Sequence, residues 1–123
     1  MPKEHVKFKV SKELSDKILQ LVEVARNSGN VRRGTNEATK AIEKGTAQLV
    51  IIAEDVDPPE VVMHIPSLCD EKKIPFVYVP NKIELGRASG IDVPCASIAI
   101  AEAGEGKNQL KDIVKEIEKA AKG

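Results

Sequence analysis

Hydrophobic residues recur along the chain in helical stripes that alternate with short continuous runs. In residues 11–29 the apolar positions stand three or four residues apart, which is the spacing of one helix face; they are Leu14, Ile18, Leu21, Val22 and Ala25. Ser11 is expected to cap the start of this helix and Gly29 its end. Residues 106–123 have the same spacing, with lysines and glutamates on the opposite face, and predict a closing amphipathic helix. Its apolar stripe comprises Leu110, Ile113, Val114, Ile117, Ala120 and Ala121.

Short apolar runs between the helical stripes predict strands. Residues 47–54, AQLVIIAE, are apolar without alternation, which is typical of an inner strand covered by helices on both faces. Residues 75–80 and 96–102 repeat this pattern, so they are predicted to form similar strands. Residues 31–33 are long enough only for an edge strand, and Gly34 ends it.

Three further helical stretches lie between these runs. Residues 36–44, NEATKAIEK, predict a short helix that stops at Gly45. Residues 58–73 open on two prolines, which suit a first helical turn, and Pro66 is expected to split or restart this helix because proline has no amide to donate. Residues 81–90 predict another helix. Helices alternating with buried strands predict a three-layer α/β/α sandwich, formed by residues 1–123 as one domain.

Composition limits the possible functions. The chain is 41% apolar, 31% charged and only 2% aromatic, so we expect a compact soluble protein with an aliphatic core. Its 19 basic and 19 acidic residues cancel, which leaves only a local patch to attract nucleic acid. The longest apolar run, residues 49–53, is far short of the roughly 20 residues that span a bilayer, so no membrane partner is expected. Cys69 and Cys95 lack metal-site spacing and stand among apolar residues, so they are predicted to be buried small hydrophobes in a cytoplasmic protein.

Few residues suggest catalysis. Histidine is the usual acid or base of catalysis near neutral pH, and the chain has two, His5 and His64, but neither stands near a nucleophile in the sequence. The acidic residues 54–57, with Glu60 beyond them, lack the spaced oxygens of a cation loop and are interpreted as solvated or helix-start charge. Residues 34–40 lack the second glycine and the Lys-Ser/Thr pair of a nucleotide-binding loop. We therefore predict no catalytic residue, metal or cofactor; the rival hypothesis is a small-molecule enzyme that uses residues 54–57 with His64.

The stretch RRGTNEATK, residues 32–40, combines cations with one carboxylate at a predicted helix start. A glycine permits close approach of a bulky partner, and the amides and positive dipole of a helix start suit a phosphate. Arg32, Arg33 and Lys40 add positive charge. Glu37 would be repelled by phosphates unless it accepted hydrogen bonds from a specific group.

The Watson–Crick edge of guanine offers two adjacent donors to such a carboxylate. In an ordinary RNA duplex that edge is paired and the deep groove excludes side chains, so Glu37 would need non-canonical pairs, a bulge or a widened groove. Asn36 and Lys40 would then serve the neighbouring acceptors. The alternative is that Glu37 only complements the helix dipole, with Thr35 and Asn36 as caps.

A family resemblance extends through almost the whole chain. RRGTNEATKAIEKG, LVIIAEDVDPPEVVMHIPSLCDEKKIPFVYVPNKIELGRASG and IDVPCASIAI together resemble the L7Ae/L30e/NHP2-like family of kink-turn RNA-binding proteins, in particular its archaeal large-subunit ribosomal members. The resemblance implies a central mixed sheet of about four strands. It also implies a non-enzymatic reader of kink-turns and kink-loops, in which a three-nucleotide bulge adjoins tandem sheared G·A pairs. The implied partners are ribosomal RNA, box C/D and H/ACA guide RNAs, archaeal RNase P RNA and the other proteins of those particles, with a monomer when free.

The resemblance also implies roles for individual residues. The base-reading and groove-fitting set comprises Gly34, Thr35, Asn36, Glu37 and Lys40. Phosphate contacts fall to Arg33 and Lys82, with Arg32 assisting, and the bulged nucleotides are covered by Ile91, Asp92 and Val93. The Asp92-Val93 pair follows the archaeal pattern of an acidic then an apolar residue, whereas eukaryotic relatives carry arginine at the second position. Val61 would pack on a flipped-out base or belong to the core, and a ribosomal subunit that binds rRNA without kink-turn specificity remains the alternative function.

Overall fold

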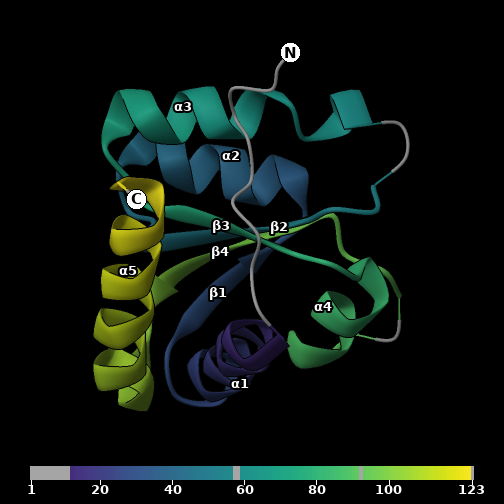
Figure 1. Cartoon of the computed structure of the whole chain (residues 1–123). Coiled ribbons are helices and arrows are strands. Elements are labelled where there is room, and N and C mark those ends of the chain that lie inside the picture. Colours follow the sequence, from purple (N-terminus) through teal and green to yellow (C-terminus); the bar gives the residue numbers. More distant parts are fainter. Residues whose placement is uncertain (1–11, 57–58, 92, 123) are drawn as a thin grey trace.

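A four-stranded sheet lies between two layers of helices in the computed structural model, which describes residues 12–56, 59–91 and 93–122 (Figure 1). The elements in chain order are α1 (Lys12–Ser28), β1 (Asn30–Arg33), α2 (Thr35–Lys44), β2 (Leu49–Ala53), the 3-10 turn η1 (Pro59–Val61), α3 (His64–Lys72), β3 (Phe76–Val79), α4 (Lys82–Ala88), β4 (Ser97–Glu102), the 3-10 turn η2 (Gly104–Gly106) and α5 (Lys107–Lys122). This confirms the predicted α/β/α sandwich. Within the described residues, no helix is long and apolar enough to cross a membrane.

The sheet is mixed, as the resemblance implied. Its strand order is β1-β4-β2-β3, with β4 antiparallel to both β1 and β2 and with β3 parallel to β2. It follows that β1, β2 and β3 all point the same way and finish at one end of the sheet, where β4 begins. Figure 1 shows η1 and α4 at this end, on the right, and α5 upright at the opposite end.

The inner strand β2 is buried on both faces, which explains its continuous apolar run. Val50 and Ile52 pack into the core beneath α2 and α3, and Ile51 faces the core of α1, α4 and α5. All five residues of β2 are buried, so the prediction for this segment is confirmed.

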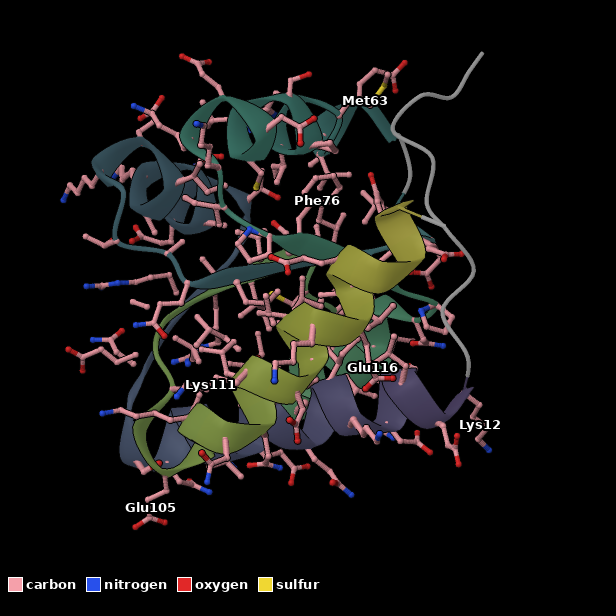
Figure 2. All side chains as sticks on the ribbon, turned by 60° about the vertical axis from the view of Figure 1, so that its left-hand side comes forward. Lys12, Met63, Phe76, Glu105, Lys111 and Glu116 are labelled. Carbon is pink, nitrogen blue, oxygen red and sulfur yellow. The ribbon has the colours of Figure 1, made fainter. Side chains whose placement is uncertain are left out.

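The same prediction for residues 75–80 is wrong. β3 is an edge strand, in which Val77 and Val79 are buried while Phe76 and Tyr78 are only partly so. The two rings pack edge to face with centroids 6.3 Å apart, and Figure 2 shows Phe76 between α3 and α5. Successive side chains point to opposite faces: Val77 and Val79 lie within the core of α1, α4 and α5, whereas Phe76 and Tyr78 pack only partly against the core beneath α2 and α3.

The helical stripes pack as their spacing predicts. The five apolar residues of α1 that define its stripe are buried, and Leu110, Ile113 and Ile117 of α5 join the same core. Figure 2 shows α5 lying across α1, with the exposed Lys111 on its outer side. The expected cap Ser11 lies outside the described residues.

The segment after β2 is less regular than its sequence suggested. A single 3-10 turn, Pro59–Val61, comes first, and the α-helix starts only at His64. Pro66 therefore stands in the first turn of α3, where amides have no intrahelical acceptor, so its missing amide costs no hydrogen bond. The prediction that Pro66 restarts the helix is confirmed.

Candidate functional site

Four segments meet at the end of the sheet where β1, β2 and β3 finish and β4 begins, and we call this surface the loop face. Its described residues are 32–40, 54–56 with 59–63, 80–87, and 91 with 93–97. Hydrogen bonds join these segments to one another. The amide of Gly34 donates to the carbonyl of Ser97 at 2.9 Å, and the amide of Cys95 donates to the carbonyl of Lys82 at 3.0 Å. The amide of Lys82 in turn donates to Asp55 Oδ1 at 2.9 Å. The starts of α2 and α4 are thus held in a fixed relation, and every candidate binding residue in the described part of the chain lies on this face.

The start of α2 is open. Gly34 precedes the helix with φ 95 and ψ 154, a conformation that side-chain-bearing residues rarely adopt, and no described atom lies within 4 Å of the position its Cβ would take. No side chain of the residues that the structure describes caps the helix by a hydrogen bond. The amides of its first turn therefore face outward at the positive end of the helix dipole.

The alternative in which Thr35 and Asn36 cap α2 is wrong. Both residues lie inside the helix, one and two positions after the N-cap Gly34, so their side chains do not hold the capping position. Thr35 Oγ1 lies 3.3 Å from Ser97 Oγ, and Asn36 is exposed. Asn36 is therefore free to meet a ligand, while Thr35 fastens α2 to β4.

Glu37 lies among cations. Lys40 Nζ is 4.0 Å from Glu37 Oε2, one turn along the helix, and the two side chains are 66% and 52% exposed. An ion pair so exposed contributes little and is readily exchanged for ligand contacts. Both residues line an open hollow of about 330 Å³ between α2 and β1, together with Asn30, Arg32, Ala41, Lys44, Thr46, Ala101 and Glu102.

The two arginines of β1 separate. Successive side chains of a strand point to opposite faces, so Arg32 faces the hollow beside Glu37 while Arg33 faces the other side of the sheet. There burial raises the pKa of the nearby Cys95 thiol, and the positive charge of Arg33 offsets part of that rise. The structure therefore groups Arg32, Glu37 and Lys40 and leaves Arg33 on the α4 side of the loop face.

The start of α4 is capped. Asn81 Oδ1 accepts hydrogen bonds from the amides of Ile83 at 2.8 Å and Glu84 at 3.1 Å, while Asp55 accepts from Lys82. The acidic residue Asp55 therefore serves as helix-start charge, as predicted. The Asn81 cap was not predicted, although an asparagine directly before a helical stretch is a signal of a helix start.

The segment after α4 is packed closely onto it. A Cβ on Gly86 would lie 2.0 Å from the carbonyl oxygen of Val93, so only glycine permits this approach. Ile91 packs partly into the core, and the side chain of Val93 is 59% exposed. Asp92 lies outside the described residues.

Val61 is a surface residue. Its side chain is 42% exposed at the end of η1, whereas the neighbouring Val62 is 6% exposed and joins the core. The alternative that Val61 belongs to the core is therefore wrong. Met63 is also exposed, at 57%, and Figure 2 shows it on the outside of the molecule where α3 begins.

Among the described residues, those of the enzyme hypothesis are not brought together as a catalytic group. His64 is exposed, and its Nε2 lies 2.8 Å from Thr39 Oγ1, which links α3 to α2. Asp55 is engaged by the start of α4, while Asp57 and His5 fall in stretches that the structure does not describe. In the described stretches, no three His, Cys, Asp or Glu residues are placed to hold a metal.

The two cysteines behave as buried small groups, as predicted. Burial raises the pKa of the Cys69 thiol to about 12, and the charge of Asp70 adds to the shift. Burial also raises the pKa of Cys95, against the opposing effects of backbone contacts with Gly34 and Ser97 and the charge of Arg33. Both thiols are therefore protonated near neutral pH and are poor nucleophiles.

Comparison with known proteins identifies a family and solved structures that resemble this one. The profile of the ribosomal protein L7Ae/L30e/S12e/Gadd45 family matches residues 16–110. The structure is similar to that of the Giardia lamblia 15.5kD RNA binding protein, with a TM-score of 0.90 and 35% sequence identity. The match covers 97% of this chain and 99% of that one.

Proposed function

Because the chain belongs to the ribosomal protein L7Ae/L30e/S12e/Gadd45 family, we propose that it binds RNA, and specifically kink-turns and kink-loops, through its loop face. The observation that carries this proposal is the start of α2. An uncapped helix start, open above Gly34, stands beside a carboxylate that is surrounded by cations. A plain phosphate-binding surface has no use for that carboxylate.

The polar half of the loop face reads the RNA. Phosphates lie against the open amides of α2 and the cations of Arg32, Arg33, Lys40 and Lys82. Glu37 accepts hydrogen bonds from the exposed edge of a guanine in a sheared G·A pair, and Asn36 serves the neighbouring acceptors. An ordinary duplex hides that edge, so the carboxylate selects for kinked RNA and against plain duplex.

The apolar half of the loop face covers the bulge. Val61, exposed at the end of η1, packs on a flipped-out base, while Ile91, Asp92 and Val93 cover the other bulged nucleotides. The RNA samples its bent form without the protein, and these contacts, available only in that form, shift the population toward it.

The same proposal implies which ribonucleoprotein particles contain this protein. An apolar Val93 after Asp92 supports membership in the archaeal ribosomal branch, with its broad choice of RNA. The protein would then serve without catalysis in the large ribosomal subunit, in box C/D and H/ACA guide particles and in RNase P, where it takes part in tRNA processing. It would reside in the cytoplasm with those particles.

The decisive experiment compares two RNAs and two glutamates. Glu37→Ala is expected to weaken binding to a kink-turn by about 1–3 kcal/mol, roughly 5- to 150-fold, as for other bidentate base contacts. Binding to a plain duplex of matched composition should change less than about threefold. Glu43→Ala, which removes an exposed carboxylate at the far end of the same helix, is the matched control and should not weaken either complex.

A gel-shift series at two salt concentrations separates base reading from general attraction, because phosphate contacts are strongly salt-dependent. Equal losses on both RNAs would contradict the proposal. So would a Lys40→Ala protein that loses affinity while Glu37→Ala does not. Either result would indicate a ribosomal subunit that binds rRNA without kink-turn specificity.

A further inference from the structure

A second hollow opens on the loop face beside α4. Its volume is about 280 Å³, and its lining residues are Ile83, Arg87, Val93 and Pro94. Ile83 and Val93 are 48% and 59% exposed, so two large aliphatic residues line the hollow without being buried in the core. Neither Ile83, Arg87 nor Pro94 is among the binding residues implied by the family resemblance.

The walls of this hollow are fixed by the backbone. The carbonyl of Val93 rests on Gly86, where no side chain fits, and the amide of Cys95 donates to the carbonyl of Lys82 at the first position of α4. The first turn of α4, which carries Ile83, is held by the Asn81 cap. The hollow is therefore built into the fold, and closing it by local collapse would break these contacts.

The hollow combines apolar walls with a free cation. Arg87 forms no ion pair with any residue that the structure describes, so its guanidinium is available to a ligand. A guanidinium matches a phosphate in shape and charge, and aliphatic walls accept the flat face of a base. The hollow is also continuous with the proposed interface, because Val93 belongs to both and Ile83 follows Lys82.

We propose that this hollow receives one unpaired nucleotide of the bound RNA, with its base against Ile83 and Val93 and its phosphate at Arg87. The inference rests on the proposed function and extends it to residues of α4 and to Pro94. A protein side chain is the other occupant that apolar walls would suit. The unpaired charge of Arg87 and the continuity with Lys82 favour the nucleotide.

The experiment uses the whole chain and four kink-turn RNAs: one intact, and three in which a single bulge nucleotide is made abasic. On the intact RNA, Ile83→Ala and Arg87→Gln should each weaken binding by about three- to tenfold. For Ile83 this is at or below the smallest loss that follows removal of an aromatic side chain on which a base stacks. For one of the three abasic RNAs, the additional loss from Ile83→Ala should vanish, because base and side chain form a single contact. Glu84→Ala, an exposed residue of the same helix outside the hollow, is the control and should cause no loss.

The salt dependence of binding distinguishes the role of Arg87 from that of Ile83. Arg87→Gln should lower the slope of log affinity against log salt by about one phosphate contact, and Ile83→Ala should leave that slope unchanged. The inference is overturned if Ile83→Ala weakens all four RNAs equally, which would indicate a merely structural role, or if it weakens none. Suppose that the unchanged protein binds the kink-turn, and that Glu37→Ala weakens this binding while Ile83→Ala and Arg87→Gln do not; then only this inference fails. If the unchanged protein binds the kink-turn no better than a plain duplex, the proposed function fails.

Discussion

Two helices begin at the loop face, one on each side of the sheet, and they begin in opposite ways. α4 starts with its amides satisfied, by Asn81 and by Asp55 from another loop, whereas α2 starts after Gly34 with no side-chain cap. An unsatisfied helix start costs stability unless water or a ligand supplies the acceptors. The difference suggests that the start of α4 is scaffold, and that the start of α2 is left open for an anionic partner.

The surroundings of the two helix starts differ in the same sense. Arg32, Glu37 and Lys40 surround the open start with charge, while Ile83 and Val93 stand exposed near the capped one. Directional hydrogen bonds select among bases, whereas aliphatic contacts cover whichever base is present. We therefore expect variants near α2 to change which RNA is bound, and variants near α4 to change how tightly.

The largest effect is expected from Gly34→Ala. The backbone at Gly34 lies in a region that is essentially restricted to glycine, so alanine should lower the free energy of unfolding by about 1–3 kcal/mol. A reoriented backbone would also misplace the open amides, and the methyl group of alanine would occupy space that the approaching RNA needs. Kink-turn affinity, measured by calorimetry well below the unfolding transition, should fall by at least about tenfold.

Gly45→Ala provides the matched control at the other end of α2. Gly45 also has a positive φ, 74, and open space at its Cβ position, so alanine there should cost comparable stability. It should leave RNA affinity unchanged. If the two variants lose affinity equally, the loss reflects destabilised α2 rather than the open helix start, and the contrast between the two helices breaks down.

A smaller effect is expected from Asn81→Ala. Removing the cap should lower the free energy of unfolding in urea by about 1 kcal/mol, since the amides of Ile83 and Glu84 lose their acceptor. Kink-turn affinity should change less than about threefold, because the cap lies within the scaffold. Asn108→Ala, at an exposed site on α5, should change neither quantity. An affinity loss as large as that of Gly34→Ala would show that the Asn81 side chain or the amides it caps contribute directly to RNA binding, and are not scaffold alone.

The sequence predicts the layers of this fold better than the details of its loop face. Continuous apolar runs identify β2 and β4 correctly because both faces of an inner strand must be apolar. The same reasoning fails for β3, since a short apolar run does not show that one flank of the strand is open. Helical spacing likewise locates the buried faces of α1 and α5, because burial follows from periodicity along a single element.

The site depends on relations between elements, which a sequence pattern does not contain. Val61 and Val62 are chemically identical, and only the geometry of η1 turns one outward and the other into the core. Thr35 resembles a cap, but the hydroxyl of Ser97, distant in sequence, lies close enough to engage its side chain. The carboxylate beside the cations could be identified from sequence, because all of those residues lie within two adjacent elements.

The smallest effect concerns the two buried thiols, one on each side of the sheet. Cys69, a residue of α3, packs into the core that α2 and α3 cover, and Cys95 packs into the core on the other side of the sheet, with α4. A thiol ionises at its ordinary pKa of 9.0 in the unfolded chain but only at about 12 for Cys69 in the folded protein. Above pH 9 the unfolded state therefore gains free energy by losing protons that the folded state keeps. The free energy of unfolding should fall from pH 9 towards pH 12 and show no such effect below pH 9, with a loss of somewhat under about 1 kcal/mol at pH 9.5 from Cys69.

Comparison of Cys69→Ala with Cys95→Ala tests whether the two sides of the sheet differ in this respect. The measured quantity is the change in unfolding free energy between pH 8 and pH 9.5 in a reducing buffer, so that packing losses common to both pH values cancel. Cys69→Ala should remove more of the alkaline loss, because Arg33 and the backbone of Gly34 and Ser97 oppose the raised pKa of Cys95. A larger reduction from Cys95→Ala would mean that the backbone of Gly34 does not lower the pKa of the Cys95 thiol in solution. The contact that joins the open start of α2 to the scaffold of α4 would then be looser than the structure indicates.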